Sequence, residues 1–262
     1  MCLLVRHAED ADPRLSLKPD ERWKGDSFSL AGRDPVLTAN GILAARGGFT
    51  EQQASQLRPG YRGMRGGIQS KIMAFQPTLI VTSPLRRSLL TTAFACEHIS
   101  PSVPIIAHPN LRELKSSKVH ARTPNHVKPG AHGVPFHVLE ETLKNTPRGG
   151  DINLSLIPKG HDGSWHGVGA TPDESKQRAL LFLDWLKERP EERIIICTHG
   201  KVLRLPRFGG INFLHGEVRK FHFDGHTMVH DPSFHVDAFE PEDASGGGGD
   251  HSITSASVKT DR

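Results

Sequence analysis

Runs of apolar residues alternate along the chain with stretches whose apolar positions have helical spacing. Continuous or alternating apolar runs predict strands at residues 1–5, 78–82, 105–107, 193–198 and 218–223. Helical spacing predicts helices from residue 39 past residue 49, over 68–75, over 85–96 and from 172 to 189. Thr171 as N-cap, Pro172 at the first position and Glu174 three residues after the cap are typical of a helix start.

Strands that alternate with helices in this way predict an α/β fold, a three-layer α/β/α domain around a mostly parallel central sheet. We expect one domain over residues 1–239. Within it, residues 115–169 have no period beyond a helical turn near 140–144, which predicts an irregular insertion or a cover over the active site. Residues 240–262 contain four consecutive glycines among polar residues and are expected to form a disordered tail.

Composition narrows the possible partners and the compartment. The 33 Lys and Arg residues exceed the 29 Asp and Glu residues only slightly and are scattered, so a nucleic-acid partner is not indicated. The apolar start of the chain is too short for a signal peptide or a membrane span, which predicts a cytoplasmic protein with no membrane partner. Cys2, Cys96 and Cys197 have neither metal nor redox spacing and are expected to be buried or incidental thiols in a reducing compartment. Composition leaves the oligomeric state open.

Polar clusters that contain His or Arg directly follow three of the predicted strands. Arg6-His7 follows the first strand, the residues from Ser83 to Arg87 follow the second, and His199-Gly200 follows the long apolar run. In open α/β sheets, ligands bind outside the carboxyl ends of the strands. Guanidinium groups match the oxygens of a phosphate, and a neutral imidazole can attack phosphorus. The three clusters therefore predict a pocket for a phosphoryl group.

Five segments, in the same order, resemble the motifs of the histidine phosphatase, or phosphoglycerate mutase-like, superfamily. They cover about the first 220 residues and are LVRHAE at 4–9, DPVLTANG at 34–41, SPLRRSLLT at 83–91, LRE at 111–113 and IICTHG at 195–200. The pattern is closest to fungal and other eukaryotic phosphoglycerate mutase-like proteins. These proteins share a stretch like DINLSLIPKG at 151–160 and a motif near Glu217.

The resemblance implies a phosphoglycerate mutase-like fold and a division of roles. His7 would be the nucleophile that becomes a covalent phosphohistidine, and Glu113 would protonate the leaving oxygen and later deprotonate water. Glu113 would therefore have to carry a proton when the substrate binds. The phosphate pocket would be formed by Arg6, Arg87, His199 and Gly200. This predicts a metal-independent, histidine acid phosphatase-like phosphomonoesterase without a cofactor, acting on a small phosphorylated substrate or a phosphoprotein.

Two alternatives to hydrolysis remain open at this point. A mutase would use the same phosphohistidine and return the phosphoryl group to a second hydroxyl of its substrate. The sequence lacks the extended motif of the mutases, and Pro13 stands where many members have a phosphate-binding Asn. A catalytically weak scaffold that has kept the fold is the second alternative.

Other residues that could take part in chemistry are interpreted more plainly. Arg86 is expected to be a surface charge and Lys201 a solvated side chain. Solvated loop histidines are preferred over a metal site, because these histidines lack ligand spacing: His108, His120, His126, His132 and His137. His161 and His166, which flank Trp165, could line the mouth of the pocket.

Overall fold

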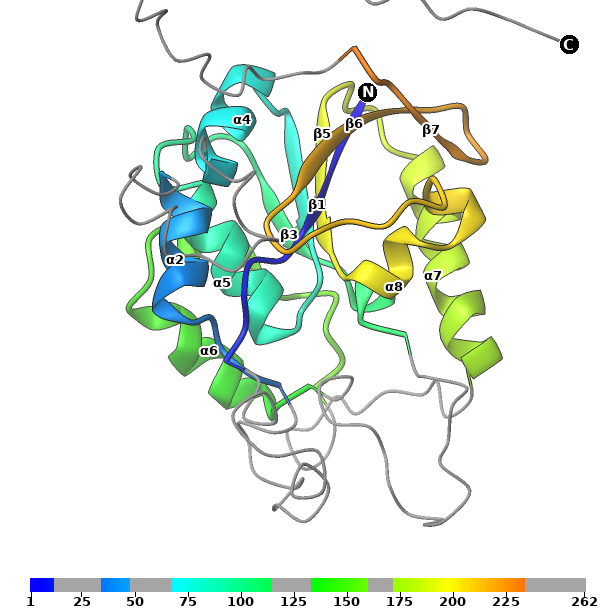
Figure 1. The fold of residues 1–262 in the computed structure, drawn as a ribbon. Helices are drawn as coiled ribbons and strands as arrows, with labels where there is room; N and C mark the ends of the chain where they lie inside the picture. Colours follow the sequence, from blue (N-terminus) through cyan, green and yellow to red (C-terminus); the bar gives the residue numbers. More distant parts are fainter. Residues whose placement is uncertain (12–33, 48–66, 115–132, 160–171, 234–262) are drawn as a thin grey trace, which may run out of the picture.

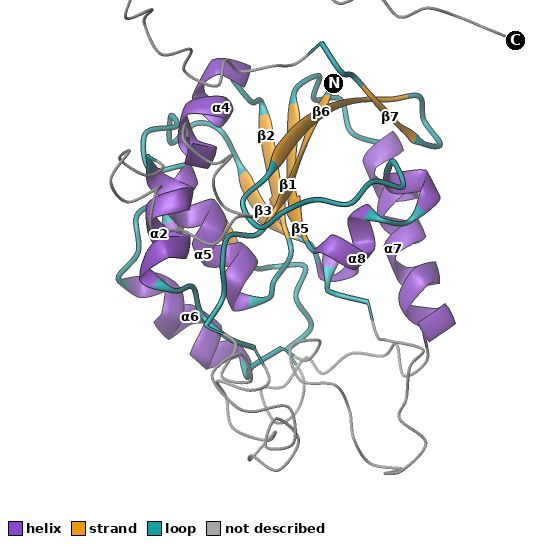
Figure 2. Ribbon diagram, in the orientation of Figure 1, coloured by secondary structure: helices purple, strands orange, loops and turns teal. Residues whose placement is uncertain are grey.

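A mixed seven-stranded sheet lies between two layers of helices in the computed structural model, which describes residues 1–11, 34–47, 67–114, 133–159 and 172–233 (Figures 1 and 2). The strands are β1 (Cys2–Arg6), β2 (Leu79–Thr82), β3 (Ile105–Ala107), β4 (Ile152–Asn153), β5 (Ile194–Thr198), β6 (Val218–Phe223) and β7 (Met228–His230). Their order across the sheet is β4-β3-β2-β5-β1-β6-β7. β1 to β5 are parallel to one another, and β6 is antiparallel to both of its neighbours, β1 and β7. The predicted mostly parallel α/β fold is therefore confirmed.

Helices cover both faces of this sheet. They are α2 (Ala39–Arg46), α4 (Gly67–Phe75), α5 (Arg86–Ala95), α6 (Phe136–Lys144), α7 (Pro172–Lys187) and α8 (Gly200–Leu203). Three short 3-10 helices accompany them: η3 (Pro109–Leu111), η4 (Gly149–Asp151) and η5 (Pro206–Phe208). Figure 2 shows α2, α4, α5 and α6 on one side of the strands and α7 and α8 on the other.

Each face of the sheet has its own hydrophobic core, because successive side chains of a strand point to opposite faces. Leu3 and Val5 of β1 pack in the core beneath α2, α4 and α5, whereas Leu4 packs in the core beneath α7. Burying one such side chain completely is worth about 1.5–3 kcal/mol. Burial on both faces explains why β1 and β5 are continuous apolar runs.

The three central strands β2, β5 and β1 deliver polar residues to one edge of the sheet. The backbone N–H of His7 donates to the carbonyl of Thr198 at 3.0 Å, and that of Ser83 donates to the carbonyl of Cys197 at 2.9 Å. The ladder thus continues one residue beyond the strands. Ser83, His199 and His7 consequently leave three adjacent parallel strands at neighbouring positions.

Two of the element predictions were wrong in part. The helix that starts at Ala39 ends at Arg46, with Gly47 as its C-cap, instead of continuing past Phe49. The stretch 115–169 is not wholly irregular, since it contains α6, η4 and the strand β4, which pairs with β3. Helix α6 forms because its apolar residues have helical spacing, so that Phe136 and two leucines are buried on one face. The short elements α8 and β7 were not predicted.

Other sequence predictions concern burial and location. Cys2, Cys96 and Cys197 are all buried and free, as predicted. Within the part of the chain that the structure describes, no helix is both long enough and apolar enough to cross a membrane. The N-cap Thr171, the position of Pro13 and the tail 240–262 lie outside the described residues.

Candidate active site

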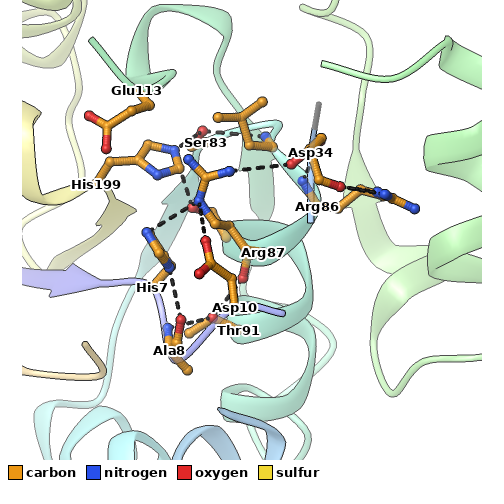
Figure 3. A network of polar contacts seen from close by, with 12 residues as sticks. His7, Ala8, Asp10, Asp34, Ser83, Arg86, Arg87, Thr91, Glu113 and His199 are labelled. Carbon is orange, nitrogen blue, oxygen red and sulfur yellow. Dashed lines mark hydrogen bonds and ion pairs between the residues drawn. The ribbon is translucent and has the colours of Figure 1, made fainter. Parts of the chain in front are cut away.

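His7, the first residue after β1, is 3% exposed and has a defined tautomer (Figure 3). Its Nδ1 lies 2.8 Å from the carbonyl oxygen of Ala8, which can only accept. Its Nε2 receives a hydrogen bond from Nε of Arg87 at 3.2 Å, and a guanidinium can only donate. The proton is therefore on Nδ1, and Nε2 carries the lone pair.

The environment also keeps His7 uncharged. Burial lowers its pKa well below the ordinary value of 6.5, and the charges of Arg87 and Arg6 lower it further. The hydrogen bond to Ala8 opposes these effects only partly. A neutral imidazole with a lone pair at Nε2 is the form that can attack phosphorus.

Arg87 is fixed by two carboxylates as well as by His7. It lies in the first turn of α5, is 3% exposed, and has its Nε 3.3 Å from Asp10 and its Nη1 3.5 Å from Asp34. Figure 3 shows its guanidinium between the two histidines and the two carboxylates. A guanidinium held from several sides is oriented before any ligand enters.

Asp34 is fully buried and links the first turn of α5 to the site. Its Oδ2 accepts from the backbone N–H of Arg86 at 2.9 Å, and burial raises its pKa to about 7. The side chain of Arg86 donates from Nε to the backbone carbonyl of Asp34 at 2.8 Å. Interpreting Arg86 as a surface charge was therefore wrong: it is half-buried and holds Asp34 in place.

His199 follows β5 and is completely buried, with its ring centroid 5.0 Å from that of His7. Its Nε2 lies 2.8 Å from the hydroxyl of Ser83 and 3.4 Å from that of Ser88. Its Nδ1 is buried and has no hydrogen-bond partner among the residues that the structure describes. Burial and the charge of Arg87 lower its pKa well below 6.5, so this imidazole is also neutral. Buried polar atoms are nearly always satisfied, so Nδ1 is an open position for a polar ligand.

Arg6 and Gly200 lie against each other at the same edge of the sheet. Nη1 of Arg6 donates to the carbonyl of Phe213 at 2.6 Å. A Cβ atom on Gly200 would lie 3.2 Å from Cζ and Nε of Arg6, tighter than most real contacts. The absence of a side chain at Gly200 therefore gives Arg6 its place.

Glu113 follows η3 and is half-buried. Its Oε1 accepts from the backbone N–H of Leu114 at 2.9 Å. Figure 3 places it on the His199 side of the cluster. The charge of Arg178 acts on the pKa of His199, and the charge of Glu113 acts on that of Arg178, which connects Glu113 to the site.

Some residues of the site, among them Asp34, Ser83 and His215, were given no role of their own from the sequence. Asp34 and Ser83 stand inside two of the recognised segments, so those segments could have indicated them. His215 gave no signal, yet its ring centroid lies 5.1 Å from that of His7. Burial, together with Arg6 and Arg87, lowers the pKa of His215 to about 3.

The interpretation of two other side chains was wrong. His108 is not solvated: it is 5% exposed and its ring packs edge-on against Phe182, with centroids 5.1 Å apart. Lys201 is half-buried, and its Nζ donates to the carbonyl of Leu114 at 3.0 Å. The helical and exposed residue His137 has the predicted solvation but not the predicted irregular backbone. The other three predicted loop histidines, His120, His126 and His132, lie outside the described residues, as do His161 and His166 of the predicted pocket mouth.

Solved structures with the same fold include an ecdysone phosphate phosphatase from Bombyx mori in complex with tungstate. It matches with a TM-score of 0.51 and 14% identity, over 92% of this chain and 97% of that one. A putative α-ribazole-5'-P phosphatase from Escherichia coli matches with a TM-score of 0.45 and 15% identity, over 88% and 96%. A phosphoserine phosphatase variant from Entamoeba histolytica, in complex with phosphoserine, has a TM-score of 0.41 and 17% identity, over 87% and 93%.

These similarities concern the fold. No protein-family profile matches the chain, and no curated protein sequence does. Only the first of the three structures has a TM-score above one half, and its low identity restricts the conclusion to architecture. The chain has the phosphoglycerate mutase-like α/β fold, as predicted from the sequence.

Proposed function

We propose that this chain is a phosphohydrolase that cleaves a phosphomonoester through a covalent phosphohistidine on His7. The observation that carries the proposal is the hydrogen bonding of His7. Nδ1 faces the Ala8 carbonyl and Nε2 faces Arg87, so a neutral nucleophilic nitrogen is directed at a guanidinium. A phosphoryl oxygen that enters the site would take over the hydrogen bond of Arg87.

In the first half of the reaction, Nε2 of His7 forms a bond to phosphorus while the ester P–O bond breaks. Glu113, carrying a proton, passes it to the leaving oxygen, so that an alcohol departs and the phosphohistidine remains. General acid catalysis of this kind contributes typically about 10²–10⁴-fold. In the second half, Glu113 takes a proton from water, the water oxygen attacks phosphorus, and the N–P bond breaks. Inorganic phosphate leaves, and both residues return to their starting forms.

The phosphate pocket of this proposal consists of Arg6, Arg87, His199 and Gly200. Phosphoryl transfer depends chiefly on alignment and on neutralisation of charge on the phosphoryl oxygens. Arg87 is fixed by Asp10 and Asp34 before substrate arrives, so it need not reorganise during the reaction. The open Nδ1 of His199 supplies a further polar contact. No step requires a metal ion or a cofactor.

The substrate class follows from the chemistry of the pocket. Two guanidinium groups and neutral imidazoles suit a phosphate monoester, as a small phosphorylated molecule or a phosphorylated side chain of a protein. The ecdysone phosphate phosphatase of the same fold is named for a phosphate ester, which supports the class but not a particular substrate.

Hydrolysis by purified protein, without added metal, tests the proposal. The native chain is assayed against p-nitrophenyl phosphate and a panel of phosphorylated metabolites, beside His7→Ala and the exposed-residue control His98→Ala. We expect phosphate release by the native chain and by His98→Ala, unaffected by a chelator, and none by His7→Ala. A radiolabelled substrate should leave an acid-labile, alkali-stable label on the native protein only.

Other outcomes would overturn the proposal in distinguishable ways. Label on His7 with transfer to a second hydroxyl, and no free phosphate, would indicate a mutase. A folded protein that neither releases phosphate nor takes up label would indicate a scaffold that has kept the fold.

A further inference from the structure

The backbone carbonyls of the segment that carries Glu113 are bound by side chains, most of them from other elements. Residues 109–114 form no strand, yet each of their six carbonyl oxygens accepts a hydrogen bond from a side chain. Thr198, next to His199, donates to Leu111 at 2.8 Å, and Lys201 donates to Leu114 at 3.0 Å. The segment is thereby tied to the end of β5 and to α8.

Arg178 of α7 makes most of these bonds. Its Nη1 donates to the carbonyls of Pro109 and Asn110 at 3.3 and 2.8 Å. Its Nη2 donates to those of Arg112 and Glu113 at 3.1 and 3.3 Å. One planar guanidinium thus fixes the peptide units on both sides of Glu113, and a lysine at this position could not span all four acceptors.

The charge of Arg178 is suited to this role. Burial lowers its pKa to about 9, with a further contribution from Arg112, and Glu113 opposes the change. The guanidinium therefore remains charged at neutral pH. Hydrogen bonds from a charged donor are about twice as strong as neutral ones, so four of them define the path of the segment closely.

We propose that Arg178 is a positioning residue for Glu113: its four backbone contacts set where the carboxyl group lies relative to His7 and His199. The inference rests on the proposed function, since it assigns Glu113 the proton transfer to the leaving oxygen. A displacement of about 1 Å in a catalytic group can cost 10²-fold in rate. Arg178 touches no reacting atom, and its hydrogen bonds reach Glu113 through the backbone of the segment.

Two nearly identical substrates test this inference. Phenyl phosphate and p-nitrophenyl phosphate differ by one nitro group, but phenolate needs protonation as it leaves and p-nitrophenolate hardly does. The quantity compared is kcat/KM, which reports the steps up to formation of the phosphohistidine, so the water step does not enter. For Arg178→Met, which keeps the apolar stem, we expect a loss of roughly 100-fold with phenyl phosphate and less than roughly 10-fold with p-nitrophenyl phosphate.

Arg148 offers a matched control. Its guanidinium also donates to backbone carbonyls, those of Ile99, Ser100 and Val103, but these lie in the connection between α5 and β3. Arg148→Met should change kcat/KM for the two substrates equally and little. Arg178→Lys, which can restore only part of the contacts, should recover part of the selective loss.

A second variant shows whether Arg178 acts through Glu113. Glu113→Gln removes the proton donor, and in this background Arg178→Met should add less than roughly 3-fold to the loss with phenyl phosphate, because residues that act as a unit are not additive. Equal losses with both phosphates, or full additivity with Glu113→Gln, would overturn the positioning role.

Hydrogen exchange separates this inference from the proposed function. Arg178→Met should lose amide protection in a peptide covering residues 109–114, whereas Arg148→Met should not. Retained protection in Arg178→Met would overturn the inference whether or not the native chain hydrolyses phosphate. If Arg178→Met loses protection but the native chain has no phosphatase activity, the proposed function is refuted, and with it the catalytic reason for the positioning.

Discussion

Nε of Arg87 donates a hydrogen bond to Nε2 of His7 over 3.2 Å, and each residue is 3% exposed. A cation placed against an imidazole inside the protein makes protonation of that imidazole unfavourable. It also leaves the lone pair of Nε2 facing a group that binds phosphate oxygens. The contact therefore joins the two properties that the proposed reaction needs, a neutral nucleophile and an adjacent positive charge.

The first prediction concerns the tautomer of His7. Nitrogen NMR should show His7 as the neutral Nδ1–H form throughout the range from pH 5.5 to pH 8, roughly the span in which an ordinary histidine titrates. The physical reasons are burial and the nearby arginines, which lower its pKa well below 6.5. Protonation of His7 near pH 6.5 would contradict the burial and charge environment described above.

The second prediction concerns Asp34, whose carboxylate faces both Arg86 and Arg87. Asp34→Asn keeps the size of the side chain but removes the ion pair, so Arg87 is held less firmly. We expect the Kd for tungstate, a tetrahedral oxyanion, to rise about tenfold, or 1.4 kcal/mol. Isothermal titration calorimetry measures it. Asp151→Asn is the control: its exposed carboxylate pairs with Arg148, outside the cluster around His7, so the Kd should be unchanged.

The third prediction concerns Gly200, where a Cβ atom would crowd the guanidinium of Arg6. Gly200→Ala should favour helix α8, because Ala exceeds Gly by about 1 kcal/mol in helix propensity. It should nevertheless weaken tungstate binding, since Arg6 must move. Gly47→Ala is the matched control, because a Cβ there meets nothing within 4 Å. If Gly200→Ala binds tungstate as tightly as the native chain does, Gly200 is not part of the phosphate pocket.

Much of this site could be predicted from the sequence because its residues directly follow buried strands. An apolar run followed by Arg6-His7 or by His199-Gly200 indicates both a strand and the edge at which its polar residues emerge. The adjacency of β1, β5 and β2 then brings these residues together. The contact of Arg87 with His7 follows from that topology, although its geometry does not.

Other features depend on tertiary contacts that leave little trace in local sequence. Arg86 looks like a surface charge because nothing nearby in the sequence shows that Asp34, which lies 52 residues earlier, folds against it. His108 looks solvated until α7 brings Phe182 against its ring. The two-residue strand β4 is too short to have a period and exists through its pairing with β3.

The last prediction concerns the stability of the protein in mild acid. The pKa of His108 is lowered to about 4 in the folded protein, whereas the unfolded chain titrates near 6.5. The unfolded state therefore binds more protons as the pH falls below 6.5, and stability is lost until the pH reaches the folded pKa. Between pH 7 and pH 5 this amounts to about 2 kcal/mol for such a histidine. His7, His199 and His215 have lowered pKa values too and act in the same direction.

Asp34 acts in the opposite direction, because its pKa is raised to about 7 in the folded protein. Its carboxyl group takes up a proton on folding in the same pH range. This offsets roughly the loss of stability that one such histidine causes. The net expectation is a steep loss of stability on acidification, measured as the free energy of unfolding in urea at a series of pH values. His108→Leu removes one titrating ring from an aromatic environment outside the pocket. Between pH 7 and pH 5, the free energy of unfolding of this variant should therefore fall by about 2 kcal/mol less than that of the native chain. An identical pH dependence in the native chain and in His108→Leu would show that His108 titrates normally in the folded protein.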